Sequence, residues 1–115
     1  MGLCESFSED EAEPFLAQIE SEWRIVEDDK KHLKLRRNWK TRNFMSALEL
    51  CSRFGAIAEE QGHHPDLHLT GWNNLEAVIF THARDGLLEA DFILAAKYDA
   101  VPKEDLLSKK KKAAS

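Results

Sequence analysis

The chain has 115 residues, of which 43% are hydrophobic and 32% are charged, a composition typical of a single globular domain. No apolar run approaches the ~20 residues that a membrane span needs, and no basic region followed by an apolar stretch marks a secretory signal. The net charge of −5 argues against nucleic-acid binding, which needs cations gathered on one face. Two cysteines do not make a disulfide framework, so we predict a reducing compartment and a cytoplasmic location.

The two ends of the chain differ in composition from its centre. We predict a flexible N-terminus at 1–7, one folded domain at 8–103 and a flexible basic tail at 104–115. The first six residues match the pattern for N-myristoylation, and Cys4 is placed for a second acyl chain. Acidic residues follow this pattern and oppose binding to an anionic membrane surface. Membrane attachment is therefore expected only if the N-terminus is acylated.

A helix followed by a hairpin is predicted for the N-terminal third. The stretch 8–11 has the pattern of a capping box that opens a helix, although a later start would put Pro14 in the first turn instead. Apolar residues then recur at helical spacing, at Phe15, Leu16, Ile19 and Trp23. Two strands are predicted at 23–26 and 32–36, joined by a polar turn at 27–31.

The strongest pattern is that of a long helix over 42–61. Its apolar residues recur every three or four positions and are predicted to face the core, at Phe44, Ala47, Leu48, Cys51, Phe54 and Ala58. Thr41 or Asn43 can cap its start. Gly62 suits the left-handed residue that ends a helix, and Pro65 prevents the helix from continuing.

A second hairpin and a last helix complete the chain. Apolar residues alternate with polar ones over 67–70, the run 75–81 is typical of a strand, and 73–74 is predicted to be a two-residue turn. A helix is predicted near 89–100 and is ended by Pro102. Its predicted inward residues are Phe92, Ile93, Ala96 and Val101.

This order of elements predicts the fold class. Helix, strand, strand, helix, strand, strand, helix favours an α+β fold, with a four-stranded antiparallel sheet and three helices packed on one face. The other face of the sheet can stay in water or pair with another subunit. Exposed sheet edges need covering, so we expect oligomers.

Four of the five histidines lie between positions 63 and 82. With the predicted two-residue turn, His82 faces Pro65 across the hairpin. His63 and His64 immediately precede that proline and therefore lie beside His82 at the open end of the hairpin. His68 lies further along and is not expected to join them. A bulge in the turn region would shift this register by one residue.

Three imidazoles at one strand end favour a site for proton transfer. The ordinary histidine pKa near 6.5 lets the ring give and take protons at neutral pH. The alternative is zinc, since three histidines and a water form a known catalytic shell. However, adjacent side chains in an extended chain point to opposite faces, which argues against a metal shared by His63 and His64. We therefore predict no metal.

The spacing of these residues resembles a family signature. Its members here are Glu59, His63-His64-Pro65, Trp72, His82 and Asp91, together with Thr81-His82 followed by Gly86-Leu87. The pattern is similar to that of the pterin-4a-carbinolamine dehydratases and covers most of the chain. The resemblance implies the α+β order given above, a homodimer or homotetramer, and no metal or organic cofactor. It also implies dehydration of 4a-hydroxytetrahydrobiopterin, left by aromatic amino acid hydroxylation, to quinonoid dihydrobiopterin in tetrahydrobiopterin recycling.

The resemblance also implies a role for each member of the cluster. His63 and His82 would transfer protons, and His64 would mainly bind and orient the pterin. Asp91 would orient a histidine, because a carboxylate commonly fixes the tautomer of an imidazole. The other implied substrate-binding residues are Glu59, Pro65, Trp72, Thr81, Ala83 and Arg84.

Some positions depart from the family pattern. Gly62 stands where some members carry an acidic residue that contacts the ligand, Leu67 where an aromatic residue is common, and Leu88 where a helix-capping serine is usual. The hairpin is one residue longer than in animal members, and Trp72 can equally be hydrophobic cover at the turn. Two other functions stay open: a non-enzymatic dimerisation or transcription-coactivator module, and a zinc-binding hydrolase.

Overall fold

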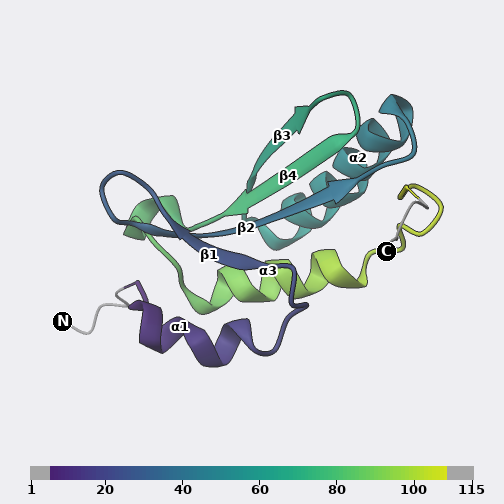
Figure 1. The fold of residues 1–115 in the computed structure, drawn as a ribbon. Helices are drawn as coiled ribbons and strands as arrows, with labels where there is room; N and C mark the ends of the chain where they lie inside the picture. The colour runs from purple at the N-terminus through teal and green to yellow at the C-terminus, as the bar shows by residue number, and fades with distance from the viewer. Residues whose placement is uncertain (1–5, 109–115) are drawn as a thin grey trace.

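The computed structural model describes residues 6–108 and forms one four-stranded antiparallel sheet with helices on one side of it (Figure 1). The elements are α1 (Glu9–Leu16), β1 (Arg24–Glu27), β2 (Leu33–Lys40), α2 (Phe44–Gln61), β3 (Asp66–Thr70), β4 (Asn74–Ile79), the short 3-10 helix η1 (His82–Arg84) and α3 (Glu89–Ala100). The strand order is β1-β2-β4-β3. The predicted α+β class and element order are confirmed, with η1 as an addition. The prediction of N-terminal acylation, and the part of the predicted tail at 104–115 that follows residue 108, lie outside the described residues.

The sheet buries one face because its apolar residues alternate along the strands. On β2 and β4 the buried side chains are Leu33, Leu35, Trp39, Leu75, Ala77 and Ile79. Trp39 contacts the ring of Phe54 from α2, and Phe54 stacks on Tyr98 from α3 with ring centroids 4.2 Å apart. These aromatic contacts fix both long helices against the sheet. Within residues 6–108, no helix is both long and apolar enough to cross a membrane.

The first helix begins where the capping pattern predicts. The Ser8 hydroxyl accepts the N–H of Glu11, and the Glu11 carboxylate accepts the N–H of Ser8, so both halves of the capping box are present. Pro14 lies inside this short helix, which therefore does not start later. Phe15 packs on Phe92 and so fixes α1 against α3. Figure 1 shows the two helices side by side.

The ends of α2 agree with the prediction, and its inward face agrees in part. The Asn43 side chain caps the start by accepting the N–H of Ser46 at 2.8 Å, and Gly62 ends the helix with a φ of 64°. The buried residues are Ala47, Leu50, Phe54 and Ala58. Phe44 and Leu48, predicted to face the core, are 48% and 42% exposed. The apolar surface of α2 is wider than the area that the sheet covers, so part of it remains outside.

The turn between β3 and β4 corrects the predicted register. Thr70 pairs with Asn74, so the turn contains three residues, with positive φ at Gly71 and Trp72. Thr41 explains the difference: its N–H donates to the Asn73 carbonyl at 2.9 Å, and the Asn73 side-chain amide donates back to the Thr41 carbonyl. The contact with Thr41, which directly follows β2, therefore determines the length of this turn.

The new register moves every predicted pair of this hairpin. His68 lies opposite Glu76 rather than Ile79, and the last paired residues are Asp66 and Val78. If the same register is continued by one residue, Pro65 lies opposite Ile79 and not opposite His82. The predicted pairing of His82 with Pro65 is therefore wrong.

The bounds of α3 match the prediction, whereas two of its predicted inward residues face solvent. Ile93 and Ala96 are exposed. The buried residues of the helix are Asp91, Phe92, Leu94, Ala95 and Tyr98, followed by Val101. The helix is apolar on most sides, so its pattern alone did not define the buried face.

The packed domain continues past the predicted boundary at 103. The Lys103 ammonium is buried and donates to the carbonyls of Tyr98, Asp99 and Val101 at 2.8–3.0 Å. These carbonyls end α3, where a cation is favourable. Leu106 is also buried, and its carbonyl accepts the N–H of Arg42.

Candidate active site

A buried carboxylate lies at the centre of the candidate site. Asp91, in the first turn of α3, is 0% exposed. Its Oδ1 lies 2.6 Å from Nε2 of His63. Its Oδ2 accepts the Thr81 hydroxyl at 2.8 Å and the N–H of Leu88 at 2.7 Å. One side chain thus joins the segment after α2, the segment after β4 and the start of α3.

This contact defines the chemistry available at His63. Because Oδ2 of Asp91 already accepts two hydrogen bonds, we assign the carboxylate as the acceptor toward His63 as well, with Nε2 of His63 as the donor. Nδ1 of the neutral ring is then the acceptor, and no hydrogen bond within the described chain occupies it. The His63 side chain is 19% exposed. It can therefore accept a proton from a bound molecule while Asp91 stabilises the resulting cation.

The end of α2 places His63 over Asp91. The left-handed Gly62 turns the chain, and the His63 N–H donates to the carbonyl of Ala58 at 3.1 Å. This is the hydrogen-bond pattern of a glycine-terminated helix. Pro65 then directs the chain into β3.

His64 lies on the solvent side of the same segment. Its Nε2 is 2.7 Å from Oε2 of Glu59, and the two side chains are 60% and 78% exposed. An exposed pair of this kind adds little stability. It joins the imidazole of His64 to the end of α2.

His82 begins η1, directly after Thr81. Thr81 and Gly86 form an isolated bridge that closes this loop, with the Thr81 N–H donating to the Gly86 carbonyl at 2.8 Å. The ring of His82 lies against that of Phe80, with centroids 4.2 Å apart and planes 44° apart. His82 is exposed, as are Ala83 and Arg84.

The structure joins some of the predicted residues and separates one. Thr81 and His63 share Asp91, so the segments that carry His63 and His82 lie at the same end of the hairpin. His82 makes no hydrogen bond with His63 or His64 in the part of the chain described. Trp72 is 59% exposed and lies in the turn at the opposite end, a strand length of about 17 Å away.

One neighbour of the cluster, Phe80, was not predicted as a site residue. Phe80 directly follows β4, and its ring contacts that of His82. In the sequence it looks like an ordinary strand residue. Only its position immediately before Thr81-His82 could have marked it. No three His, Cys, Asp or Glu side chains among residues 6–108 are arranged to hold a metal ion.

The fold and the site define a class of protein: an α+β domain in which a buried aspartate orients a histidine at the open end of a hairpin. Residues 5–101 match the family described as pterin 4 alpha carbinolamine dehydratase, and the chain belongs to this family.

Relatives from a plant and from bacteria carry the same description. The chain is 46% identical over 106 residues to "Pterin-4-alpha-carbinolamine dehydratase 2, mitochondrial" of Arabidopsis thaliana, covering 92% of this chain and 56% of the relative. It is 41% identical over 92 residues to a "Putative pterin-4-alpha-carbinolamine dehydratase" of Alkaliphilus metalliredigens, covering 80% and 78%. The chain thus spans little more than half the length of the plant protein.

A solved structure shares the fold. The crystal structure titled "transcriptional coactivator/pterin dehydratase from Brucella Melitensis" matches with a TM-score of 0.70 and 24% identity, over 83% of this chain and 96% of the other. At this identity the similarity concerns the fold.

Proposed function

We propose that this protein is a hydro-lyase that dehydrates 4a-hydroxytetrahydrobiopterin to quinonoid dihydrobiopterin, and so serves tetrahydrobiopterin recycling after aromatic amino acid hydroxylation. The observation that carries the proposal is the hydrogen bond between buried Asp91 and His63, in a chain of this family. The substrate loses the hydroxyl at C4a and the proton at N5, a net loss of one molecule of water. Elimination of water involves no net oxidation, so no redox cofactor is required.

Proton transfer is assigned to two histidines. His63 takes the N5 proton at Nδ1, and Asp91 stabilises the imidazolium that forms. His82 delivers a proton to the hydroxyl at C4a, which leaves as water, and proton exchange with solvent then restores both histidines. Neutral and protonated imidazoles can do both near neutral pH. His64, oriented by Glu59, contacts the pterin from the solvent side.

The ring edge of the pterin is expected to bind backbone groups. The residues assigned to this contact are Pro65, Thr81, Ala83 and Arg84, on the two segments that carry His63 and His82. The N–H groups of Thr81 and Arg84 already donate to the carbonyls of Gly86 and Thr81, so they are not the donors of this contact. Trp72 is too far along the hairpin to contact a pterin held by the same chain at this end.

The proposal is tested by dehydration of synthetic 4a-hydroxytetrahydropterin, followed by ultraviolet absorbance. His63→Ala and His82→Ala should each lower the rate by ~10²-fold or more, because each removes a proton-transfer group. His68→Ala is the matched control, since this exposed histidine lies opposite Glu76 within the hairpin. Its rate should equal that of the wild type. Unchanged rates in both His63→Ala and His82→Ala would contradict the assigned roles.

We also propose that the protein is a cytoplasmic homodimer or homotetramer. The two cysteines support a reducing compartment. Self-association is supported by apolar side chains that α2 leaves exposed, Phe44, Met45 and Leu48.

A further inference from the structure

The side chain of His82 is held by a different kind of contact from those that hold His63 and His64. His63 is held by Asp91 and His64 by Glu59. In residues 6–108 the ring nitrogens of His82 make no hydrogen bond, and its side-chain ring contact is Phe80, at 4.2 Å between centroids. A group that transfers protons must keep its orientation, since small misplacements slow catalysis. The ring of Phe80 is the contact that can provide this orientation.

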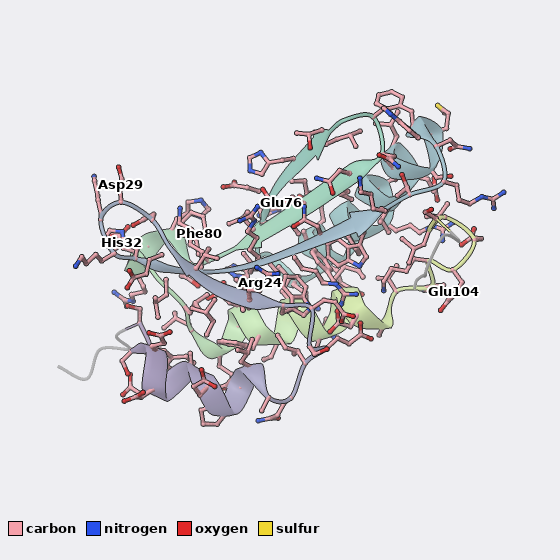
Figure 2. All side chains as sticks on the ribbon, in the orientation of Figure 1. Arg24, Asp29, His32, Glu76, Phe80 and Glu104 are labelled. Carbon is pink, nitrogen blue, oxygen red and sulfur yellow. The ribbon has the colours of Figure 1, made fainter. Side chains whose placement is uncertain are left out.

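Phe80 is itself well fixed. It is partly buried and packs against the hydrophobic core. Nζ of Lys34, on the neighbouring strand β2, lies 4.2 Å from the centre of its ring, within the range of a cation–π contact. Figure 2 shows Phe80 at the end of the sheet where His32 and Asp29 mark the β1–β2 loop.

That loop holds Lys34 in place. Oδ2 of Asp28 lies 3.6 Å from Nζ of Lys34. Oδ1 of Asp28 accepts the backbone N–H groups of His32 and Lys30, at 2.9 and 2.8 Å. The hydrogen bond from His32 is the main cause that lowers the pKa of Asp28, so its carboxylate stays charged opposite the ammonium. A chain of contacts therefore runs from Asp28 through Lys34 and Phe80 to His82.

We propose that Phe80 is a positioning residue for His82: its ring, anchored by Lys34, orients the imidazole for proton transfer. The proposal rests on the proposed dehydratase function. Aromatic rings pack on each other in defined tilted arrangements, which an aliphatic side chain of similar volume does not impose. Phe80 thus restricts the orientation of the His82 ring.

Three variants test this role. Phe80→Leu keeps an apolar side chain but removes the ring, Phe80→Tyr keeps the ring, and Phe15→Leu removes a ring between α1 and α3, remote from His82. Turnover is measured with 4a-hydroxytetrahydropterin. The ring-proton signal of His82, assigned with His82→Ala, is followed by NMR, because a neighbouring aromatic ring shifts it.

Phe80→Leu should lower kcat about 10- to 100-fold with little change in KM, because it misplaces a catalytic group. The His82 signal should lose its ring-current shift in the same variant. Phe80→Tyr should keep the wild-type kcat and a shifted signal, and Phe15→Leu should leave both unchanged.

The outcomes separate the two proposals. An unchanged His82 signal or an unchanged kcat in folded Phe80→Leu overturns the role of Phe80. If that variant fails to fold, loss of kcat in folded Phe80→Tyr overturns it, and retention supports it. A wild type that does not dehydrate the substrate, with the His82 signal still shifted by Phe80, overturns the proposed function instead.

Discussion

Asp91 connects the fold with the proposed chemistry. It accepts hydrogen bonds from His63, from Thr81 and from the N–H of Leu88 at the start of α3. Leu88 cannot cap that helix with its side chain, so the Asp91 carboxylate is the side chain that satisfies the helix start. The family resemblance implied that Asp91 orients a histidine. Which histidine it orients depends on how the segments pack, which the spacing of residues does not give.

Asp91→Asn tests this residue. The asparagine amide keeps the shape of the side chain, but its N–H₂ group must face one of the donors whose hydrogen bonds Asp91 accepts. The neutral amide also cannot stabilise a cationic His63. We expect kcat to fall at least tenfold, in line with the loss of assisted proton transfer. The melting temperature should also fall, because a buried polar group loses a partner.

Glu89→Gln is the matched control for Asp91→Asn. Glu89 lies in the same first turn of α3 but is exposed. It should retain the wild-type kcat and melting temperature. Equal losses in both variants would mean that the helix start, and not the contact with His63, explains the effect of Asp91.

At the scale of elements, predictions from sequence succeed where the deciding contacts are local. The cap of α1 lies within four residues, and the glycine that ends α2 acts on its own turn. The prediction of the β3–β4 turn was wrong because its deciding contact is not local: Thr41, 32 residues away in the chain, holds Asn73. The contact of Phe80 with His82 follows from the path of the chain after β4, and no residue pattern marks it.

Substitutions of Gly62 test how much the left-handed residue at the end of α2 contributes to stability. Its φ of 64° is unfavourable for residues with a Cβ, although an added Cβ would meet no atom within 4 Å. Gly62→Ala should therefore lower the free energy of unfolding by about 1–2 kcal/mol through backbone strain alone. Gly62→Asn should lose less, because asparagine tolerates this conformation better.

Chemical denaturation measures these changes in the free energy of unfolding. Because Gly62 precedes His63, Gly62→Ala should also reduce kcat more than Gly62→Asn does. Equal stability of both variants and the wild type would contradict the role of this glycine as the helix end.

For the whole molecule, the surface chemistry indicates which face can bind another copy. The open face of the sheet carries charged side chains such as Arg24 and Glu76 (Figure 2). Arg36 lies opposite Arg24 on this face and forms an ion pair with Glu76. The exposed apolar residues of α2 are Phe44, Met45 and Leu48, with Met45 71% exposed. The sequence alone predicts pairing only through the open face and the edges of the sheet, whereas these exposed apolar residues make α2 the better candidate.

Leu48→Lys tests self-association through α2. In an oligomer joined through α2, the lysine ammonium would be buried without a partner, and burying an unpaired charge is costly. The variant should therefore sediment as a monomer where the wild type is an oligomer. Ile93→Lys is the control, because Ile93 is 45% exposed on α3 and so replaces an apolar surface residue outside α2. It should sediment like the wild type. A wild type that remains monomeric, or an oligomer that Ile93→Lys dissociates and Leu48→Lys does not, would place self-association elsewhere than on α2.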